Sequence, residues 1–155
     1  MNVGDLATSR VIAVPAEESI DRAIAIMEEH EIHHLPVVSA GRVVGMLSDR
    51  DILTAVGGLG SAKRRLPGGW VAGPEKVADI MAKPVHTLAP GDTIRLAARL
   101  MIRERIHAIP LVRSGELAGI VTAVDLLRAI LAALELTEMK RPLFGDRFGS
   151  SSQEN

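Results

Sequence analysis

The sequence predicts an α/β (α+β) fold built from two copies of one β-α-β-β-α unit. Residues 45–53 read GMLSDRDIL and residues 119–127 read GIVTAVDLL, so a hydroxyl side chain precedes an aspartate by three positions in both. Asp51 and Asp125 lie 74 positions apart, and this offset aligns residues 5–53 with their second copy without a gap, giving 13 identities in 49 positions. Chance would supply about three or four. The chain is therefore a tandem duplication.

Length and composition limit the classes of function. The 155 residues suit one compact domain or two small ones that share a core. A net charge of −1 gives no electrostatic case for a nucleic-acid or membrane partner, and the absence of cysteine excludes disulfides and thiolate chemistry. No apolar run approaches the roughly 18 residues of a spanning helix, and the first ten residues lack the features of a secretion signal. We expect a cytoplasmic protein.

Each copy is predicted to begin with a strand and a helix. The β-branched runs VIAV (11–14) and VHTL (85–88) predict the strands. Ser19 and Thr93 stand where a helix N-cap belongs, because their side-chain oxygens can accept from an early backbone N–H. After each cap, apolar residues recur with the i, i+3, i+4, i+7 spacing of one helix face. They are Ile20, Ala23, Ile24 and Met27 in the first copy and Ile94, Ala97, Ala98 and Met101 in the second.

A β-hairpin and a second helix complete each copy. Residues 35–47 (LPVVSAGRVVGML) and 109–121 (IPLVRSGELAGIV) each place two apolar runs around a short Gly-containing turn, which predicts a hairpin. Gly45 and Gly119 leave room for a backbone or a ligand to approach closely. The hydroxyl-x-x-Asp segment then opens the second helix. A unit of about fifty residues buries little core alone, so the two copies should pack on each other.

The repeat divides the chain into four segments. Residues 1–56 form the first domain and residues 76–134 the second. The Gly- and Pro-rich residues 57–75 are expected to link them, and residues 135–155 to form a polar tail.

This pattern resembles the tandem CBS (cystathionine-β-synthase) domain pair, or Bateman module. The resemblance runs from Val3 to about Leu134 and rests on the motif hhPVV…G…hhGhh[ST]xxDhh, which occurs twice. VADIM (77–81) also resembles the opening of such a domain, whereas its counterpart VGDLA (3–7) has Ala in place of the expected Met. The resemblance implies two CBS repeats packed sheet to sheet as one pseudo-two-fold module with two clefts.

The resemblance also implies a function. Proteins of this kind are non-catalytic regulatory modules whose clefts bind an adenine nucleotide (AMP, ADP or ATP), with Mg²⁺ as an optional companion ion. S-adenosylmethionine is an alternative ligand, and a structural dimerisation module with empty clefts is the rival interpretation. A homodimer paired through its helix faces and an unidentified regulated protein partner are expected.

The repeated hydroxyl and aspartate fit such a cleft. Asp51 and Asp125, in the first turn of a helix, can accept both hydroxyls of a ribose in a charge-assisted way. Ser48 and Thr122 can donate to a phosphate or ribose oxygen, and the helix N-terminus adds free N–H groups for phosphate. The same pattern also describes helix N-capping, which can coexist with ligand binding.

Basic residues are expected on the phosphate side of the site. His33 and His107 match a family His position just before the hairpin, and His34 falls where an Arg often stands. Ala108 departs from that pattern, so the second copy should supply less positive charge. Arg50, beside Asp51, is a further phosphate partner. The alternative for each His is a partly buried residue that ends a helix.

The resemblance implies the remaining contacts. Backbone groups near Ile12–Ala13 and His86–Thr87 should meet the adenine, and Leu35 and Ile109 should pack on its face. The expected nucleotide-binding residues are Ser48, Asp49, Arg50, Asp51, Thr122, Asp125, His33, His34, His107, Leu35, Ile109, Pro110, Ile12, Ala13, His86 and Thr87.

One motif suggests a different chemistry. Residues 30–34 (HEIHH) satisfy H-E-x-x-H, which on a helix binds Zn²⁺ and supplies a general base. Pro36 biases the preceding residues away from helix, and the aligned segment ERIHA (104–108) lacks the motif. We therefore expect no metal site, no catalytic residue and no enzyme activity.

Overall fold

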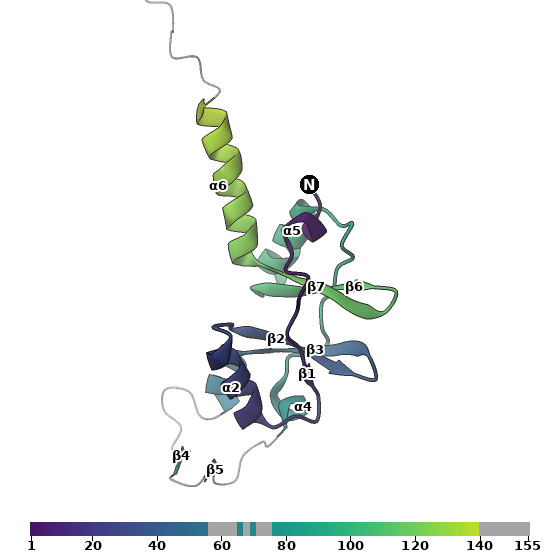
Figure 1. The fold of residues 1–155 in the computed structure, drawn as a ribbon, viewed down its shortest axis with the longest axis vertical. Coiled ribbons are helices and arrows are strands. Elements are labelled where there is room, and N and C mark those ends of the chain that lie inside the picture. Colours follow the sequence, from purple (N-terminus) through teal and green to yellow (C-terminus); the bar gives the residue numbers. More distant parts are fainter. Residues whose placement is uncertain (56–64, 67–68, 71–75, 140–155) are drawn as a thin grey trace, which may run out of the picture.

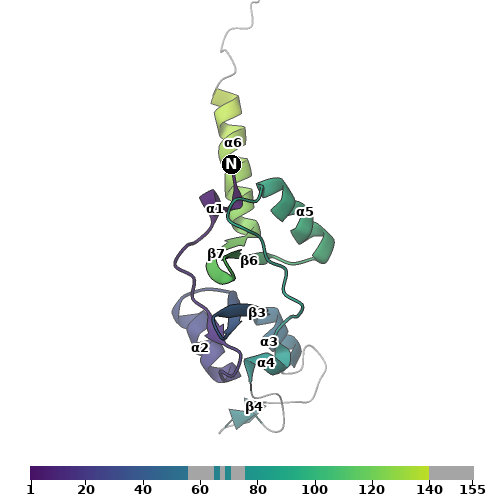
Figure 2. The same cartoon turned by 90° about the vertical axis from the view of Figure 1, so that its right-hand side faces the viewer.

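The computed structural model describes residues 1–55, 65–66, 69–70 and 76–139. Two similar α+β halves are stacked along the long axis of the molecule (Figure 1). In each half a small sheet lies toward the middle and helices cover its outer side, and the view turned by 90° agrees (Figure 2). The predicted sheet-to-sheet arrangement of two repeats is therefore confirmed.

The lower half in Figure 1 contains the three-stranded sheet of the first repeat. Its strand order is β1-β2-β3, with β1 parallel and β3 antiparallel to β2. The first repeat contains α1 (Val3–Leu6), β1 (Val14–Pro15), α2 (Ile20–Glu29), β2 (His34–Ser39), β3 (Arg42–Ser48) and α3 (Asp49–Ala55).

The second repeat follows the same order with one difference. The strand expected at residues 85–88 is reduced to a single parallel bridge between Leu88 and Leu111. The second repeat contains α4 (Val77–Ile80), α5 (Ile94–Glu104), β6 (Ala108–Arg113), β7 (Glu116–Thr122) and α6 (Ala123–Met139). Between the repeats, β4 (Arg65–Leu66) pairs antiparallel with β5 (Gly69–Trp70), and the rest of the predicted linker lies outside the described residues.

Each hairpin turn requires positive φ angles, which explains why each contains a glycine. Ala40 and Gly41 have φ of 48° and 75°, and Ser114 and Gly115 have φ of 53° and 87°. Two successive positive φ angles match the twist of a tight hairpin, and glycine adopts them without strain. The predicted hairpins are therefore confirmed in both repeats.

The long helices begin at the predicted caps. Ser19 Oγ accepts from the backbone N–H of Arg22, and Thr93 Oγ1 accepts from that of Leu96, both at 3.2 Å. The apolar stripe of each helix faces its sheet: Ala23 in α2 and Ala97 in α5 are fully buried. Sequence and packing thus agree on which helix face meets the core.

The repeats exchange their opening segments. Val3 of α1 is buried in the core of the second repeat, and its N–H donates to Asp92 O at 2.8 Å. Val77 of α4 is buried in the core of the first repeat, and its N–H donates to Glu18 O at 2.9 Å. Figure 2 shows α1 beside α6, and α4 beside α3. The predicted domains 1–56 and 76–134 therefore divide the sequence but not the two cores.

The exchanged segments also occupy the space that two glycines leave open. A Cβ added to Gly45 would clash with the side chain of Met81, and one added to Gly119 would lie 3.2 Å from the carbonyl oxygen of Thr8. The backbone of Ala82 pairs with Met46 next to this first contact. What approaches Gly45 and Gly119 closely is the protein chain itself.

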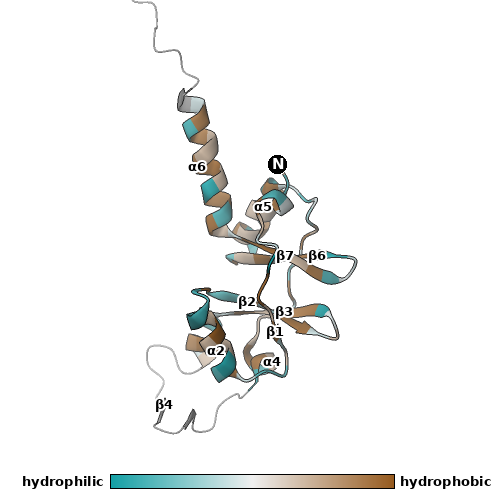
Figure 3. Ribbon diagram, viewed as in Figure 1, coloured by the Kyte–Doolittle hydropathy of each residue, from teal (hydrophilic) through white to brown (hydrophobic). Residues whose placement is uncertain are grey.

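Helix α6 continues beyond the predicted end of the second domain at residue 134, as far as Met139, and its C-terminal part extends away from the body of the molecule (Figure 1). Apolar residues occur along its exposed length (Figure 3). Val124, Leu127, Leu131 and Leu134 are each more than half exposed. Their 3-4-3 spacing gathers them on one face of the helix.

Candidate functional site

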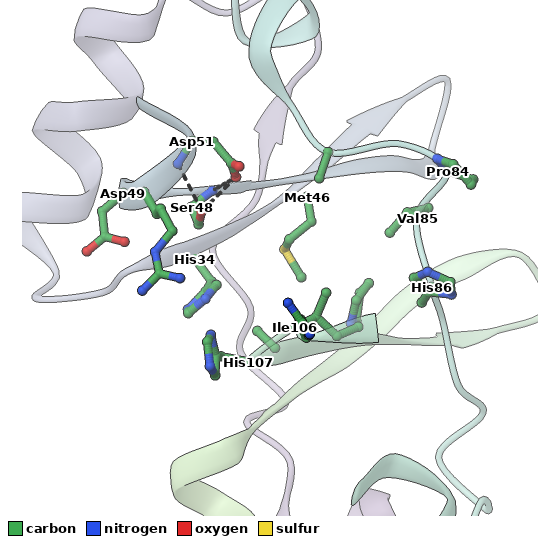
Figure 4. A pocket seen from close by; sticks show the side chains of 15 residues that line it. His34, Met46, Ser48, Asp49, Asp51, Pro84, Val85, His86, Ile106 and His107 are labelled. Carbon is green, nitrogen blue, oxygen red and sulfur yellow. Dashed lines mark hydrogen bonds between the residues drawn. The ribbon is translucent and has the colours of Figure 1, made fainter. Parts of the chain in front are cut away.

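A first cleft, of about 250 Å³, lies between the two repeats (Figure 4). Three segments meet there: the junction of β3 with α3, the chain that follows α4, and the junction of α5 with β6. The first cleft is lined by His34, Met46, Ser48, Asp49, Arg50, Asp51, Ala82, Pro84, Val85, His86, Arg105, Ile106, His107, Ala108 and Pro110.

A second cleft, of about 520 Å³, is its repeat-related counterpart. It is lined by Thr8, Arg10, Val11, Ile12, Glu31, Ile32, His33, His34, His107, Ile120, Thr122, Ala123, Val124, Asp125 and Arg128. Every lining residue of the first cleft except His34 and Pro110 lies 74 positions from a lining residue of the second. The duplication has therefore built two related clefts, and each takes walls from both repeats.

In each motif the hydroxyl and the aspartate form a reciprocal cap at the N-terminus of a helix. Asp51 Oδ2 accepts from Ser48 N–H at 2.7 Å and from Ser48 Oγ–H at 2.6 Å, while Asp51 N–H donates to Ser48 Oγ at 3.2 Å. The second copy repeats these bonds between Thr122 and Asp125 at 2.8, 2.6 and 3.3 Å. Capping therefore fixes the position of both carboxylates beside their clefts.

This cap changes the expected role of the hydroxyls. A hydroxyl has one proton to donate, and Ser48 and Thr122 already give theirs to the aspartate. The expectation that they donate to a ligand is therefore not met in this arrangement, although each oxygen keeps acceptor capacity. The second carboxylate oxygen differs between the clefts: Asp125 Oδ1 lies 3.6 Å from Arg128 Nη1, whereas Asp51 Oδ1 has no hydrogen-bond partner among the described residues.

Histidines connect the clefts. His34 and His107 line both of them, and Figure 4 shows the two rings close together near Asp49. His33, on the second cleft, meets Asp49 of the first, with 3.0 Å between Nδ1 and Oδ2. Burial lowers the pKa of His34, a shift that neighbouring His107 and His33 reinforce and the carboxylates of Asp49 and Asp51 oppose. A neutral His34 is therefore favoured in the free protein.

Further charged residues line the clefts that the motif alone did not indicate. Arg105 lies on the first cleft, and Arg10, Glu31 and Arg128 lie on the second. Arg105 and Glu31 are related by the repeat and follow α5 and α2 with positive φ angles of 55° and 52°. The same offset that identified the duplication could have indicated both residues, because each lies two positions before a predicted histidine.

Several expected residues lie elsewhere. Leu35 and Ile109 have no exposed surface and belong to the two cores, so they cannot pack on a ligand in either cleft. Each of these residues immediately precedes a proline in its strand, at a position where the side chain points into the core. Ala13 and Thr87 are not among the residues that line the clefts, although their neighbours Ile12 and His86 are. The remaining expected residues all line one cleft or both.

The zinc-like motif does not form a metal site. His30 ends α2 as its C-cap and His34 begins β2, so the two are not on one helix. Among the described residues there is no group of three or more His, Asp or Glu side chains that could hold a metal ion. Over the same part of the chain, none of the helices has the length and apolar character needed to span a membrane.

Comparison with protein-family models gives two matches to the model described as CBS domain, at residues 3–58 and 77–132. A CBS domain-containing protein YhcV of Bacillus subtilis is 30% identical over 125 residues, which cover 81% of this chain and 82% of the relative. An inosine-5'-monophosphate dehydrogenase of Korarchaeum cryptofilum is 36% identical over 116 residues, but the match spans only 21% of that enzyme.

Solved structures show the same fold. The CBS domain pair of protein MJ0100, in complex with 5'-methylthioadenosine and S-adenosyl-L-methionine, superposes with a TM-score of 0.73 at 25% identity, covering 86% of this chain and 98% of that one. CBSX2 in complex with AMP superposes with a TM-score of 0.70 at 26% identity, with the same coverage of both chains.

Proposed function

This chain belongs to the CBS domain family, as a pair of CBS domains, and we propose that it is a non-catalytic regulatory module that binds adenine nucleotides (AMP, ADP or ATP) in its two clefts. The observation that carries this proposal is the repeated carboxylate at a helix N-terminus, held at the cleft by its own cap. An ordinary cap needs no cleft, whereas both of these lie on one.

The carboxylate suits a ribose. Asp51 Oδ2 is held by Ser48, which leaves Oδ1 with no hydrogen-bond partner among the described residues. An ionised carboxylate has about four lone-pair sites, so it can accept ribose hydroxyls as well as the cap bonds. Such bonds are charge-assisted and strong. In the second cleft Asp125 would do the same, with Arg128 beside it.

The walls of each cleft suit an adenine ring. Met46, Val85 and Ile106 bring apolar surface to the first cleft, and Figure 4 shows their side chains around its interior. Ile120, Val11 and Ile32, which the repeat relates to them, line the second. These residues take the role that the sequence assigned to Leu35 and Ile109. Pro110 and His86 also line the first cleft, and Ile12 lines the second.

Similar structures support an adenosine ligand. The complex of CBSX2 holds AMP, and that of MJ0100 holds 5'-methylthioadenosine and S-adenosyl-L-methionine. These ligands share an adenosine moiety, which is the part that the carboxylate and apolar walls of this chain would recognise. S-adenosylmethionine is thus the alternative ligand. Mg²⁺ would arrive with the phosphates of ADP or ATP, since no metal cluster is found in the described part of the chain.

We infer a homodimer from the exposed face of α6. Leu127, Leu131 and Leu134 are 63%, 57% and 57% exposed, an unusual exposure for three leucines on one helix face. Pairing of this face with a second copy would bury it. The chain would act in the cytoplasm, where adenine nucleotides are abundant, through a regulated protein that is still to be identified.

The rival function is a structural module that dimerises through α6 and leaves its clefts empty. The exposed leucines favour it independently of the clefts. Calorimetric titration of protein stripped of bound ligand, using AMP, ADP, ATP and S-adenosylmethionine, separates the two functions. Saturable binding of any of these compounds supports the sensor, and no binding of all four supports the structural module.

A further inference from the structure

A further cavity, of about 470 Å³, lies beside α1 and the β6–β7 hairpin, and we refer to it as the α1 cavity. It shares no lining residue with either of the two clefts. Its volume falls within the range of small-molecule sites. The residues that line the α1 cavity include Asn2, Asp5, Ala7, Ser9, Gly91 and Arg113.

Backbone hydrogen bonds fix two walls of the α1 cavity. Gly4 N–H donates to Pro90 O at 2.9 Å, which holds α1 against the chain that precedes α5. Thr8 and Ile120 exchange two backbone bonds of 3.0 Å, which hold the chain after α1 against β7. The cavity is therefore framed by segments whose positions are set by the fold.

A small side chain leaves part of this space open. In the first repeat the side chain of Met81 lies against Gly45. The repeat places Ala7 at the position of Met81, and a Cβ added to Gly119 would lie 3.4 Å from the Cβ of Ala7. Ala7 thus occupies the same place as Met81 but lacks the three further heavy atoms of the methionine side chain.

A second difference between the repeats also opens the cavity. Lys76 Nζ bonds to Glu17 Oε2 in the first repeat, which joins α4 to the chain before α2. The repeat places Asn2 and Gly91 at these two positions. A Cβ added to Gly91 would have nothing within 4 Å. The α1 cavity therefore has no equivalent of the ion pair that spans the corresponding place in the first repeat.

Two side chains of opposite charge line the cavity and keep unused bonding capacity. The guanidinium of Arg113, at the end of β6, has no hydrogen bond or ion pair among the described residues. Asp5 Oδ2 accepts from Asn2 N–H at 2.8 Å, and over the same residues Oδ1 has no partner. Ser39 stands at the position of Arg113 in the first repeat, so the duplication has this cation in one copy alone.

We propose that the α1 cavity binds a small zwitterion, a free α-amino acid, with its carboxylate on Arg113 and its ammonium group on Asp5. The planar guanidinium presents paired N–H donors that match a carboxylate. Asp5 repels a simple anion and Arg113 repels a simple cation, whereas a zwitterion is attracted by both. The space beside Ala7 accommodates a small side chain, and Ser9 adds a hydroxyl. This site goes beyond the adenosine clefts and does not depend on them.

Titration of the ¹⁵N-labelled chain, followed by NMR, tests this proposal. The probes are glycine, L-alanine and L-serine, and the controls are propionate and ethylamine, which each lack one of the two charges. We expect saturable shifts of the backbone N–H signals of Ser9, Gly91 and Arg113 with each amino acid. Because both charged groups are exposed, the Kd should be in the millimolar range. The two controls should cause no saturable shift.

Two variants borrow their residues from the first repeat. Ala7→Met should fill the cavity and abolish binding, and it should fold because Met81 already packs against a glycine in this way. Arg113→Ser should weaken binding by about fivefold. The matched control Arg99→Ser, at an exposed residue of α5 that does not line the α1 cavity, should bind like the wild type.

Three outcomes would overturn the proposal. Propionate that binds as tightly as L-alanine would show a simple carboxylate site. Amino-acid binding that survives Ala7→Met, with shifts at His34 and His107 instead, would place the ligand in the clefts. No saturable shift at concentrations far above the expected Kd would show that the α1 cavity does not bind amino acids.

Discussion

Substitution of Asp51 separates its capping role from its ligand role. Asp51→Ala removes an acceptor of two bonds from Ser48, at 2.7 and 2.6 Å. Loss of such a cap costs about 1–2 kcal/mol of the free energy of unfolding. Asp51→Asn keeps an oxygen at the same place and should cost less than about 1 kcal/mol. Urea denaturation monitored by circular dichroism measures both values.

Ligand affinity should follow a different order. A hydrogen bond to a charged group contributes about 1.5–3 kcal/mol, and 1.4 kcal/mol corresponds to a factor of ten in affinity. Both variants lose the charge, so both should bind AMP about tenfold to a hundredfold more weakly. If Asp51→Asn keeps wild-type stability and also wild-type affinity, Asp51 is only a cap, and our interpretation of the cleft is wrong.

Three further predictions test other parts of the account. Gly4→Ala should lower the free energy of unfolding by about 1–2 kcal/mol, because the added Cβ would lie 2.8 Å from Pro90 O. The control Gly91→Ala, whose added Cβ would have nothing within 4 Å, should change the free energy of unfolding by less than about 0.5 kcal/mol. Equal effects of the two substitutions would argue against the exchange of opening segments. Leu131→Glu should convert the dimer to a folded monomer, as measured by sedimentation velocity. The control Ile102→Glu on α5, at a residue that is 78% exposed, should leave the dimer intact. A monomeric wild-type protein would contradict the α6 interface. Because burial lowers the pKa of His34 in the folded protein, His34 of the unfolded chain binds a proton first as the pH falls. The free energy of unfolding should therefore decrease as the pH drops through about 6.5, and His34→Gln should make this decrease smaller. The same pH dependence in the wild type and in His34→Gln would contradict this prediction.

The repeat allowed much of the fold to be predicted. The caps at Ser19 and Thr93, the hairpins and the buried faces of the two long helices follow from local spacing, which acts over only a few residues. The exchange of α1 and α4 could not be read in this way. Val3 and Val77 are each buried in the core of the other repeat, and no spacing within a few residues of either one indicates this.

The sequence also predicted only part of the candidate site correctly. The motif indicated Ser48, Asp51 and their copies, because a cap and a cleft both require them at the start of a helix. The residue before each proline was assigned to the adenine, although Leu35 faces the core. That error came from sequence proximity to the histidines. In a strand, neighbouring side chains point to opposite faces, so His34 can line a cleft while Leu35 cannot.

A crystal structure of the protein with adenosine would test most directly the claim that the repeat-related clefts are adenosine sites. We expect two adenosines per chain, with a ribose hydroxyl within hydrogen-bond distance of Asp51 Oδ1 in one cleft and of Asp125 in the other. Adenosine in the separate cavity beside Asp5 and Arg113, or no bound adenosine at a saturating concentration, would show that the two clefts are not adenosine sites.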